Sequence, residues 1–314
     1  MGNLWHVKNW FRVGKNISWK LNFDTFEAFL YLKWPRKRFL EAADRKHAFV
    51  LSYLKKELAP VIEKYRNIEE SGAKADEKII WTLWWQGIGS APPLIRKCIE
   101  TIERNAGKAS VRVITKDNWK DYIDIPDYIR EKREKGYISF AQLSDIIRFL
   151  LLEKYGGMWL DSTIFVSHEI PERYFERPFF SQHTKYAETC FVQHNMWHGF
   201  SIGASPHGKL VSFCREMFLE YWKTHDTLVD YLMIDYVIMT AYNEFEDVKE
   251  EIDSLEYTSE RLYDLVGMLD QPYDRKWLEE LEKDCLFSKL DWHRKYRTTR
   301  NGEPTFYAQL FDEG

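Results

Sequence analysis

One long apolar stretch at positions 139–167 restricts the fold more than any other part of the chain. It reads SFAQLSDIIRFLLLEKYGGMWLDSTIFVS. Up to position 151 its apolar residues recur every three or four positions, which predicts a helix with a buried face. Gly156 and Gly157 then predict a turn, because glycine readily adopts the positive φ that ends many helices. Residues 158–160 predict a short buried strand that ends at Asp161.

A few polar side chains stand out against this apolar background. Gln142, Asp145 and Arg148 follow each other at intervals of three residues, which predicts one polar stripe along the helix. Asp161 follows the strand, and open α/β folds bind ligands at the carboxyl ends of their strands. Taken alone, an Asp/Arg pair one turn apart also serves as a helix-stabilising ion pair, and a strand-end Asp as a turn residue. The two features together favour a ligand site.

The region before this stretch predicts a parallel sheet. Residues 78–85 are rich in strand formers, residues 94–105 have the spacing of an amphipathic helix, and residues 110–115 predict a second strand. This order is a βαβ unit, whose two strands are parallel. It is typical of nucleotide-binding α/β folds, although neither a GxGxxG nor a P-loop sequence occurs.

Size and composition predict a cytoplasmic protein with a large core. The chain has 314 residues, of which 45% are hydrophobic. Its four cysteines are scattered without a CxxC pair, so neither a zinc site nor a disulfide framework is expected. That usage fits a reducing compartment. We expect no signal peptide and no membrane span, because no apolar run is long enough.

Charge is distributed unevenly along the chain. Residues 1–65 contain 13 Lys/Arg and 6 Asp/Glu, a net charge of +7, which leaves −11 for the remaining residues. Tryptophan beside basic residues favours the headgroup layer of a membrane, so this segment predicts peripheral contact with an anionic bilayer. An ordinary solvated helical face remains the alternative. Nucleic acid is not expected as a partner, because the body is acidic and contains no recognised binding module.

Asp235 is a further polar residue in an apolar setting. It lies in the middle of a helical pattern over residues 228–242. A buried carboxylate needs a partner, so Asp235 belongs either to an ion pair or to a site. Asn195, Trp197 and His198 are additional candidates for a ligand pocket.

Three motifs give the chain a family resemblance. IIWTLWWQG, SDIIRFLLLEKYGGMWLDST and KLDWH together resemble the capsular polysaccharide synthesis family, over about residues 75–310. That family is related to the α-mannosyl and α-galactosyl transferases with a DXD motif, and the middle motif also resembles the glucosyltransferase domain of the large clostridial toxins. The resemblance implies a GT-A fold, an α/β fold with a Rossmann-like mixed sheet flanked by helices. We therefore predict a helical amino-terminal extension over residues 1–75 and a GT-A glycosyltransferase domain over residues 76–314.

The resemblance also implies roles for particular residues. Asp145 and Arg148 would contact the donor sugar, and Asp161 would contact the metal and the donor. Other residues would bind the nucleotide: Leu83, Trp84 and Gln86 at the uracil, with Trp84 stacking on it, and Lys289, Trp292 and His293 at the diphosphate. The implied cofactor is Mn²⁺ or Mg²⁺, held by Asp161 and His293. One departure stands out, because Thr163 occupies the position of the second acid of the DXD pattern.

The implied function is a hexosyltransferase reaction. The enzyme would move a hexose from a UDP-sugar to a growing bacterial capsular polysaccharide. The acceptor would be a lipid-linked oligosaccharide at the inner face of the plasma membrane. The related families retain the anomeric configuration, and no residue of this chain is an evident enzymic nucleophile. The alternative is a non-catalytic relative that binds nucleotide-sugars or glycans and has lost a metal ligand at Thr163.

Overall fold

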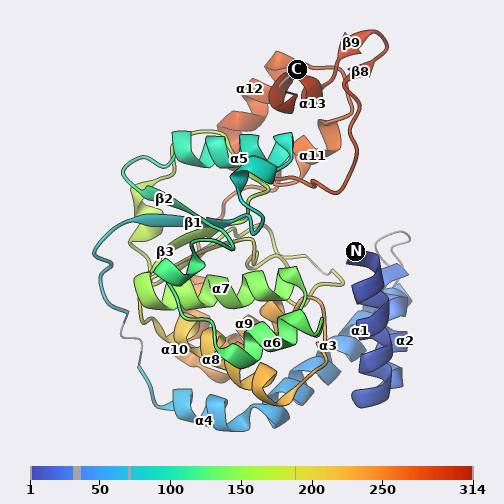
Figure 1. Cartoon of the computed structure of the whole chain (residues 1–314), viewed down its shortest axis with the longest axis vertical. Helices are drawn as coiled ribbons and strands as arrows, with labels where there is room; N and C mark the ends of the chain where they lie inside the picture. Colours follow the sequence, from blue (N-terminus) through green and yellow to red (C-terminus); the bar gives the residue numbers. More distant parts are fainter. Residues whose placement is uncertain (1, 31–36, 70–71, 188, 313–314) are drawn as a thin grey trace.

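A five-stranded mixed sheet forms the centre of the protein, in a computed structural model that describes residues 2–30, 37–69, 72–187 and 189–312 (Figure 1). Its strand order is β2-β1-β3-β6-β5. β1 is parallel to β2 and β3, whereas β6 is antiparallel to β3 and β5. The bounds are β1 (Ile79–Leu83), β2 (Ser110–Ile114), β3 (Gly157–Leu160), β5 (Phe179–Ser181) and β6 (Ser201–Ala204).

One face of the sheet is covered by α5 and by the helices of the carboxyl-terminal part, which lie above the sheet in Figure 1. Helix α5 (Pro93–Arg104) connects β1 to β2 and confirms the predicted βαβ unit. Its apolar side packs with α11 (Asp264–Met268), α12 (Arg275–Asp284) and α13 (Phe306–Phe311). A small hairpin of β8 (Thr299–Arg300) and β9 (Glu303–Pro304) precedes α13.

The other face is covered by α7 (Phe140–Tyr155), which is buried on most of its sides. The Ser139 hydroxyl caps this helix by accepting a hydrogen bond from the backbone N–H of Gln142. Four more helices complete this layer: α6 (Asp127–Glu134), α8 (Lys209–Thr224), α9 (Met233–Glu244) and α10 (Glu246–Asp253). The predicted α/β class, with a mixed sheet flanked by helices, is confirmed.

Gly157 allows β3 to lie against β1. Its φ is +91°, and a Cβ atom built on it would lie 2.3 Å from the carbonyl oxygen of Ile79. Gly156 before it has a φ of +66° and ends α7. Both positions therefore require glycine, as the predicted turn does. Because this turn sets where β3 begins, it also sets where β3 delivers Asp161.

A second, two-stranded sheet brings a late segment of the chain, residues 287–289, close to the end of β3. Strand β4 (Ile164–Val166) pairs antiparallel with β7 (Phe287–Lys289). In this register Lys289 lies opposite Ile164. The pairing therefore places Lys289 beside the segment that follows Asp161.

The amino-terminal part is helical, as predicted. It comprises α1 (Gly2–Asn16), α2 (Trp19–Leu30), α3 (Lys37–Glu57) and α4 (Ala59–Arg66). Val13, Leu54 and Ile62 belong to the same hydrophobic cluster as the apolar residues of α7, α8 and α9. The helices thus share a core with the body, and a domain boundary at residue 75 stays a prediction.

We predict that Gly157→Ala destabilises the protein. The new methyl group meets the Ile79 carbonyl, and alanine disfavours the positive φ. The free energy of unfolding in urea should fall by at least about 2 kcal/mol. Gly267→Ala is the matched control, since a Cβ atom there has no neighbour within 4 Å. It lies in α11 and should change stability by less than about 1 kcal/mol. Equal effects of the two substitutions would contradict the argument.

Candidate active site

A cleft of about 750 Å³ opens at the carboxyl ends of β1 and β3. It is bounded by α7, by the segment after β3, by the start of α9 and by the residues that follow β7. Seven of the nine predicted site residues line it: Leu83, Asp145, Arg148, Asp161, Lys289, Trp292 and His293. The structure therefore brings together residues from four separate segments, as the resemblance implied.

A chain of charged groups crosses the floor of the cleft. The Arg148 Nη2 lies 3.4 Å from the Asp145 Oδ1 and 3.2 Å from the Asp161 Oδ1. Arg148 also donates a hydrogen bond to the carbonyl of Gly199, and its guanidinium lies 4.9 Å from the centre of the Trp159 ring. These contacts hold Arg148 rigidly, and only 5% of its side chain is exposed.

Asp161 is held from three directions. Its Oδ1 accepts hydrogen bonds from Arg148 and from the Trp159 indole N–H, at 3.2 and 2.9 Å. Its Oδ2 accepts a hydrogen bond of 2.8 Å from the Lys289 ammonium, which also donates to the Thr163 hydroxyl at 2.6 Å. Asp161 and Lys289 keep 29% and 21% of their side chains exposed, so both remain accessible from the cleft.

The two acids beside Arg148 have opposite pKa shifts. Burial raises the pKa of Asp145 to about 7, against the opposing effect of Arg148. Burial also acts to raise the pKa of Asp161, but Lys289 and Arg148 outweigh it and hold that pKa below its usual value. At neutral pH Asp161 is therefore ionised, while Asp145 exchanges its proton near pH 7. Pairs of titratable groups separated in this way are common at functional sites.

Asp235 is a residue of the cleft. Its Oδ1 accepts a hydrogen bond of 3.1 Å from the indole N–H of Trp197, and no ion pair within the described ranges includes it. Burial raises its pKa to about 7. Of the other pocket candidates, Asn195 and His198 line the cleft, whereas Trp197 is fully buried behind Asp235. This arrangement favours the interpretation of Asp235 as a site residue over its interpretation as a member of an ion pair.

Several buried polar atoms around the cleft have no hydrogen-bond partner in the part of the chain that the structure describes. Among them are the Nε2 of His198, the Oε1 of Gln193, the Oε1 of Gln142 and the Nε of Arg148. His198 and Gln193 line the cleft, and Gln142 donates its amide N–H to Asp145 at 3.0 Å. Burial lowers the pKa of His198 to about 4, so its imidazole is neutral. Because unpaired buried polar groups are costly, these atoms are suited to bind ligand hydroxyl groups.

The predicted uracil-binding residues are only partly brought together. Leu83 lines the cleft, but Trp84 does not. Trp84 instead packs edge-on against Trp292, with ring centres 5.2 Å apart. Gln86 is exposed in the loop after β1 and does not line the cleft, so its role at the uracil stays a prediction. β1 ends at Leu83, and Gln86 lies in the turn that follows, in which the Gly87 N–H donates to the Trp84 carbonyl at 3.0 Å.

The residues present do not fit the predicted Mn²⁺ or Mg²⁺ site at Asp161 and His293. A hard cation needs several oxygen ligands, and the described residues contain no group of three metal-ligating side chains. More directly, the Lys289 ammonium lies between Asp161 and Thr163, where such a cation would bind. Both oxygens of Asp161 already accept hydrogen bonds from cationic side chains. His293 is exposed, and its ring lies tilted against that of Trp292, with ring centres 4.1 Å apart.

Comparison with known sequences decides the family. A family profile described as "Capsular polysaccharide synthesis protein" matches residues 33–310. The chain belongs to this family. The match begins at residue 33, earlier than the motifs alone implied, and so includes α3 and α4 but not α1 and α2.

Two other comparisons add little to this assignment. The chain is similar to a solved structure titled "PaToxG Glycosyltransferase", with 14% identity and a TM-score of 0.40. The likeness covers 67% of this chain and 83% of that one and is too distant to assign residues. No curated protein sequence matches. Within the described ranges, no helix combines the length and apolar character needed to cross a bilayer.

Some residues of the cleft carried no signal in the sequence. Tyr231, Tyr263 and Phe200 contribute its aromatic walls. Phe200 also lies under the Lys289 ammonium, 4.9 Å from the ring centre. Each lies in or beside a loop whose position depends on tertiary packing, so no periodic pattern marks them.

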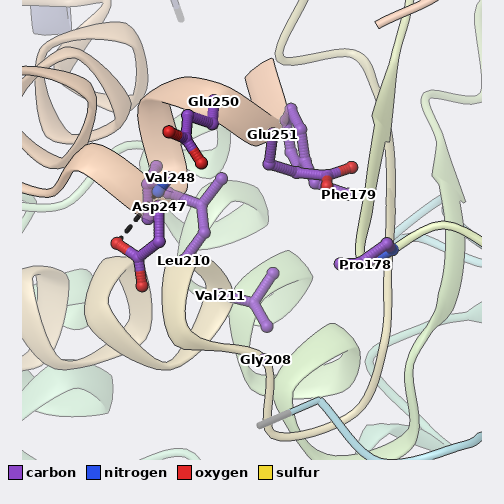
Figure 2. A pocket seen from close by; sticks show the side chains of 9 residues that line it. All are labelled: Pro178, Phe179, Gly208, Leu210, Val211, Asp247, Val248, Glu250 and Glu251. Atoms are coloured by element: carbon purple, nitrogen blue, oxygen red, sulfur yellow. Dashed lines mark hydrogen bonds between the residues drawn. The ribbon is translucent and has the colours of Figure 1, made fainter. Parts of the chain in front are cut away.

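A second pocket has a volume of about 250 Å³, and Figure 2 shows the side chains that line it. It is formed between α8, α10 and the start of β5, and three carboxylates surround it: Asp247, Glu250 and Glu251. Asp247 is already paired with Lys209 at 2.8 Å. The pocket shares no residue with the cleft, so it has no part in the site.

We predict opposite pH dependence for two isosteric substitutions. Asp145 has a folded-state pKa above its unfolded value, so ionising it costs stability as pH rises from about 4 to about 7. Asp145→Asn should remove that cost and exceed wild type in unfolding free energy by roughly 2–4 kcal/mol above pH 7, but not below pH 4.

Asp161→Asn should lower the free energy of unfolding at neutral pH, which is the opposite of the effect expected for Asp145→Asn. The folded-state pKa of Asp161 is lowered, so its ionised form stabilises the protein above the unfolded pKa, and this contribution is lost as pH falls. Urea titrations of the three proteins between about pH 2 and pH 8 measure both effects, because the contribution of Asp161 is lost only below its unfolded pKa of about 4. Parallel pH profiles for the two variants would contradict the assigned charge states.

Proposed function

We propose that this family member is a glycosyltransferase that binds a UDP-hexose in the cleft and transfers the hexose to a glycan acceptor. One observation carries the proposal: a carboxylate at the end of β3 is held between a buried guanidinium and an accessible ammonium at the wall of a deep cleft. Cations suited to a diphosphate and carboxylates suited to sugar hydroxyls thus lie within one ligand's length of each other.

Lys289 supplies the accessible positive charge. An ammonium group has three N–H donors, and two of them are used by Asp161 and Thr163. The third donor is left for a phosphate oxygen of the donor substrate. As the bond between the sugar and the diphosphate breaks, negative charge grows on the leaving group, and a fixed cation stabilises it.

The acids and the unpaired polar atoms of the cleft would orient the sugar. Asp145 and Asp235 accept hydrogen bonds from its hydroxyl groups in this proposal, and His198 supplies a neutral ring nitrogen. Fixed polar contacts of this kind lower the barrier by holding the reacting atoms in place. Trp292, which is 39% exposed, is the accessible aromatic ring for the base, with Trp84 supporting it from behind.

The proposed reaction proceeds on one face of the sugar. The bond from the anomeric carbon to the diphosphate breaks through an oxocarbenium-like state, and the acceptor hydroxyl oxygen bonds to that carbon from the same side. The departing phosphate oxygen takes the acceptor proton. This route needs no enzymic nucleophile and yields a retained configuration. The acceptor we propose is a lipid-linked capsular oligosaccharide at the inner face of the plasma membrane.

The function is tested by release of UDP from a panel of UDP-hexoses. Asp161→Asn should lower the rate at least about 100-fold, because Lys289 loses the charge that positions it. Asp117→Asn is the matched control, since Asp117 is exposed on the loop after β2. Wild-type protein that binds UDP-sugars but releases no UDP from any of them, with any acceptor, would favour the non-catalytic alternative.

A further inference from the structure

The outer side of the α1–α2 hairpin is unusually apolar for an exposed surface. Its exposed large apolar side chains, here called the docking face, keep between 37% and 65% of their surface accessible. They are Leu4, Val7, Trp10, Phe11, Trp19, Phe23, Phe26 and Phe29. The Trp10, Phe11 and Trp19 rings lie 5.2 to 6.3 Å apart, so the face is continuous across both helices. Contiguous apolar patches of this kind mark interaction sites.

The inner side of the hairpin is already occupied by the body of the protein. Asn9 exchanges hydrogen bonds of 2.9 and 3.1 Å with the backbone of Leu228. The indole N–H of Trp5 donates to the carbonyl of Gly136 at 3.1 Å. These contacts fix which side of the hairpin faces outward, so the exposure of the docking face follows from the fold.

The unpaired charges around the docking face are positive. Lys8, Lys15 and Lys20 are exposed, and within the described ranges none of them forms an ion pair. The only two acids between residues 2 and 30 are Asp24 and Glu27. Both carboxylates form ion pairs with Arg45 at 3.0 Å, which offsets their charge. Aromatic side chains bordered by lysines are suited to the boundary between anionic headgroups and acyl chains.

We propose that the docking face binds an anionic lipid bilayer. In Figure 1 the hairpin stands at the edge of the molecule, on the side where the chain begins. The His6 ring lies 5.1 Å from the ring of Tyr231, which lines the cleft. Docking therefore brings the cleft close to the bilayer. That last step rests on the proposed function, because it matters only if the acceptor is held in the membrane.

Vesicle co-sedimentation tests the docking face. Wild-type protein should sediment with phosphatidylcholine vesicles that contain phosphatidylglycerol, and binding should weaken as salt rises. The triple variant Phe11→Ser, Phe23→Ser, Phe26→Ser should bind at least tenfold more weakly. The matched control is Tyr257→Ser, which removes an aromatic ring with 57% exposure elsewhere on the surface.

The outcomes separate this inference from the proposed function. UDP release with a water-soluble acceptor should be unchanged in the triple variant, and circular dichroism should show the same fold. Equal vesicle binding by the triple variant and wild type would overturn the inference, as would no binding by wild type. A stable dimer that the triple variant abolishes, without vesicle binding, would assign the face to a second copy instead.

A separate observation concerns the positive charge of Lys289 in the cleft. The Lys289 ammonium bridges Asp161 Oδ2 at 2.8 Å and Thr163 Oγ1 at 2.6 Å. These are the two positions that the acids of a DXD pattern would occupy. The exchange of the second acid for Thr163 leaves one carboxylate, which already pairs with both the Lys289 ammonium and the Arg148 guanidinium. A divalent cation placed there would lie against the ammonium and be repelled by it.

The geometry points to Lys289 as a replacement for the divalent cation in binding the nucleotide diphosphate. This inference rests on the proposed function. Isothermal titration of UDP into EDTA-treated protein should give a dissociation constant within about twofold of that measured with Mn²⁺. Lys289→Met should weaken binding at least tenfold. Lys276→Met, at an exposed position of α12, is the control.

The possible results are distinct. UDP binding by wild type that requires Mn²⁺ would overturn the role of Lys289 and leave the proposed function standing. If Lys289→Met binds UDP as tightly as wild type does, the role of Lys289 is likewise overturned and the proposed function is left standing. UDP binding under neither condition would overturn the proposed function and this inference together.

Discussion

The attraction between Asp161 and its two cationic neighbours is the interaction on which the site depends. Arg148 comes from α7, Asp161 from the end of β3 and Lys289 from β7, so three distant segments meet at one carboxylate. An ionised carboxylate at the rim of a core strand would be costly without them. With them, one acid is kept charged, and a neighbouring acid, Asp145, is left to titrate near neutral pH. The same contacts that satisfy the carboxylate thus create the chemical asymmetry of the cleft.

Local spacing accounts for what could be predicted of this site. Asp145 and Arg148 share one side of α7 because they are three residues apart, and Asp161 ends β3 because the apolar run ends there. Gly156 and Gly157 predict the turn between α7 and β3. In each case a few adjacent residues contain the information, so a single sequence is sufficient.

Long-range pairing accounts for what could not be predicted. Nothing in the sequence near Lys289 shows that β7 pairs with β4, yet this register places the ammonium between Asp161 and Thr163. The aromatic walls at Tyr231 and Tyr263 depend on packing in the same way. The position of Gln86 outside the cleft also depends on the turn after β1, which the spacing of residues did not indicate. The excess of basic residues near the amino terminus was visible, but the outward aromatic face on α1 and α2 follows only from knowing which side packs on the body.

The β4–β7 pairing also has a consequence for how the protein is made. Lys289 follows Asp161 by 128 positions, so the ribosome must add all of the intervening residues before the two can meet. Until then the carboxylate of Asp161 lacks one of its two cationic partners, and contacts of such long sequence separation form late and slowly. Pairing of β4 with β7 is therefore the step that completes the charged cluster of the cleft.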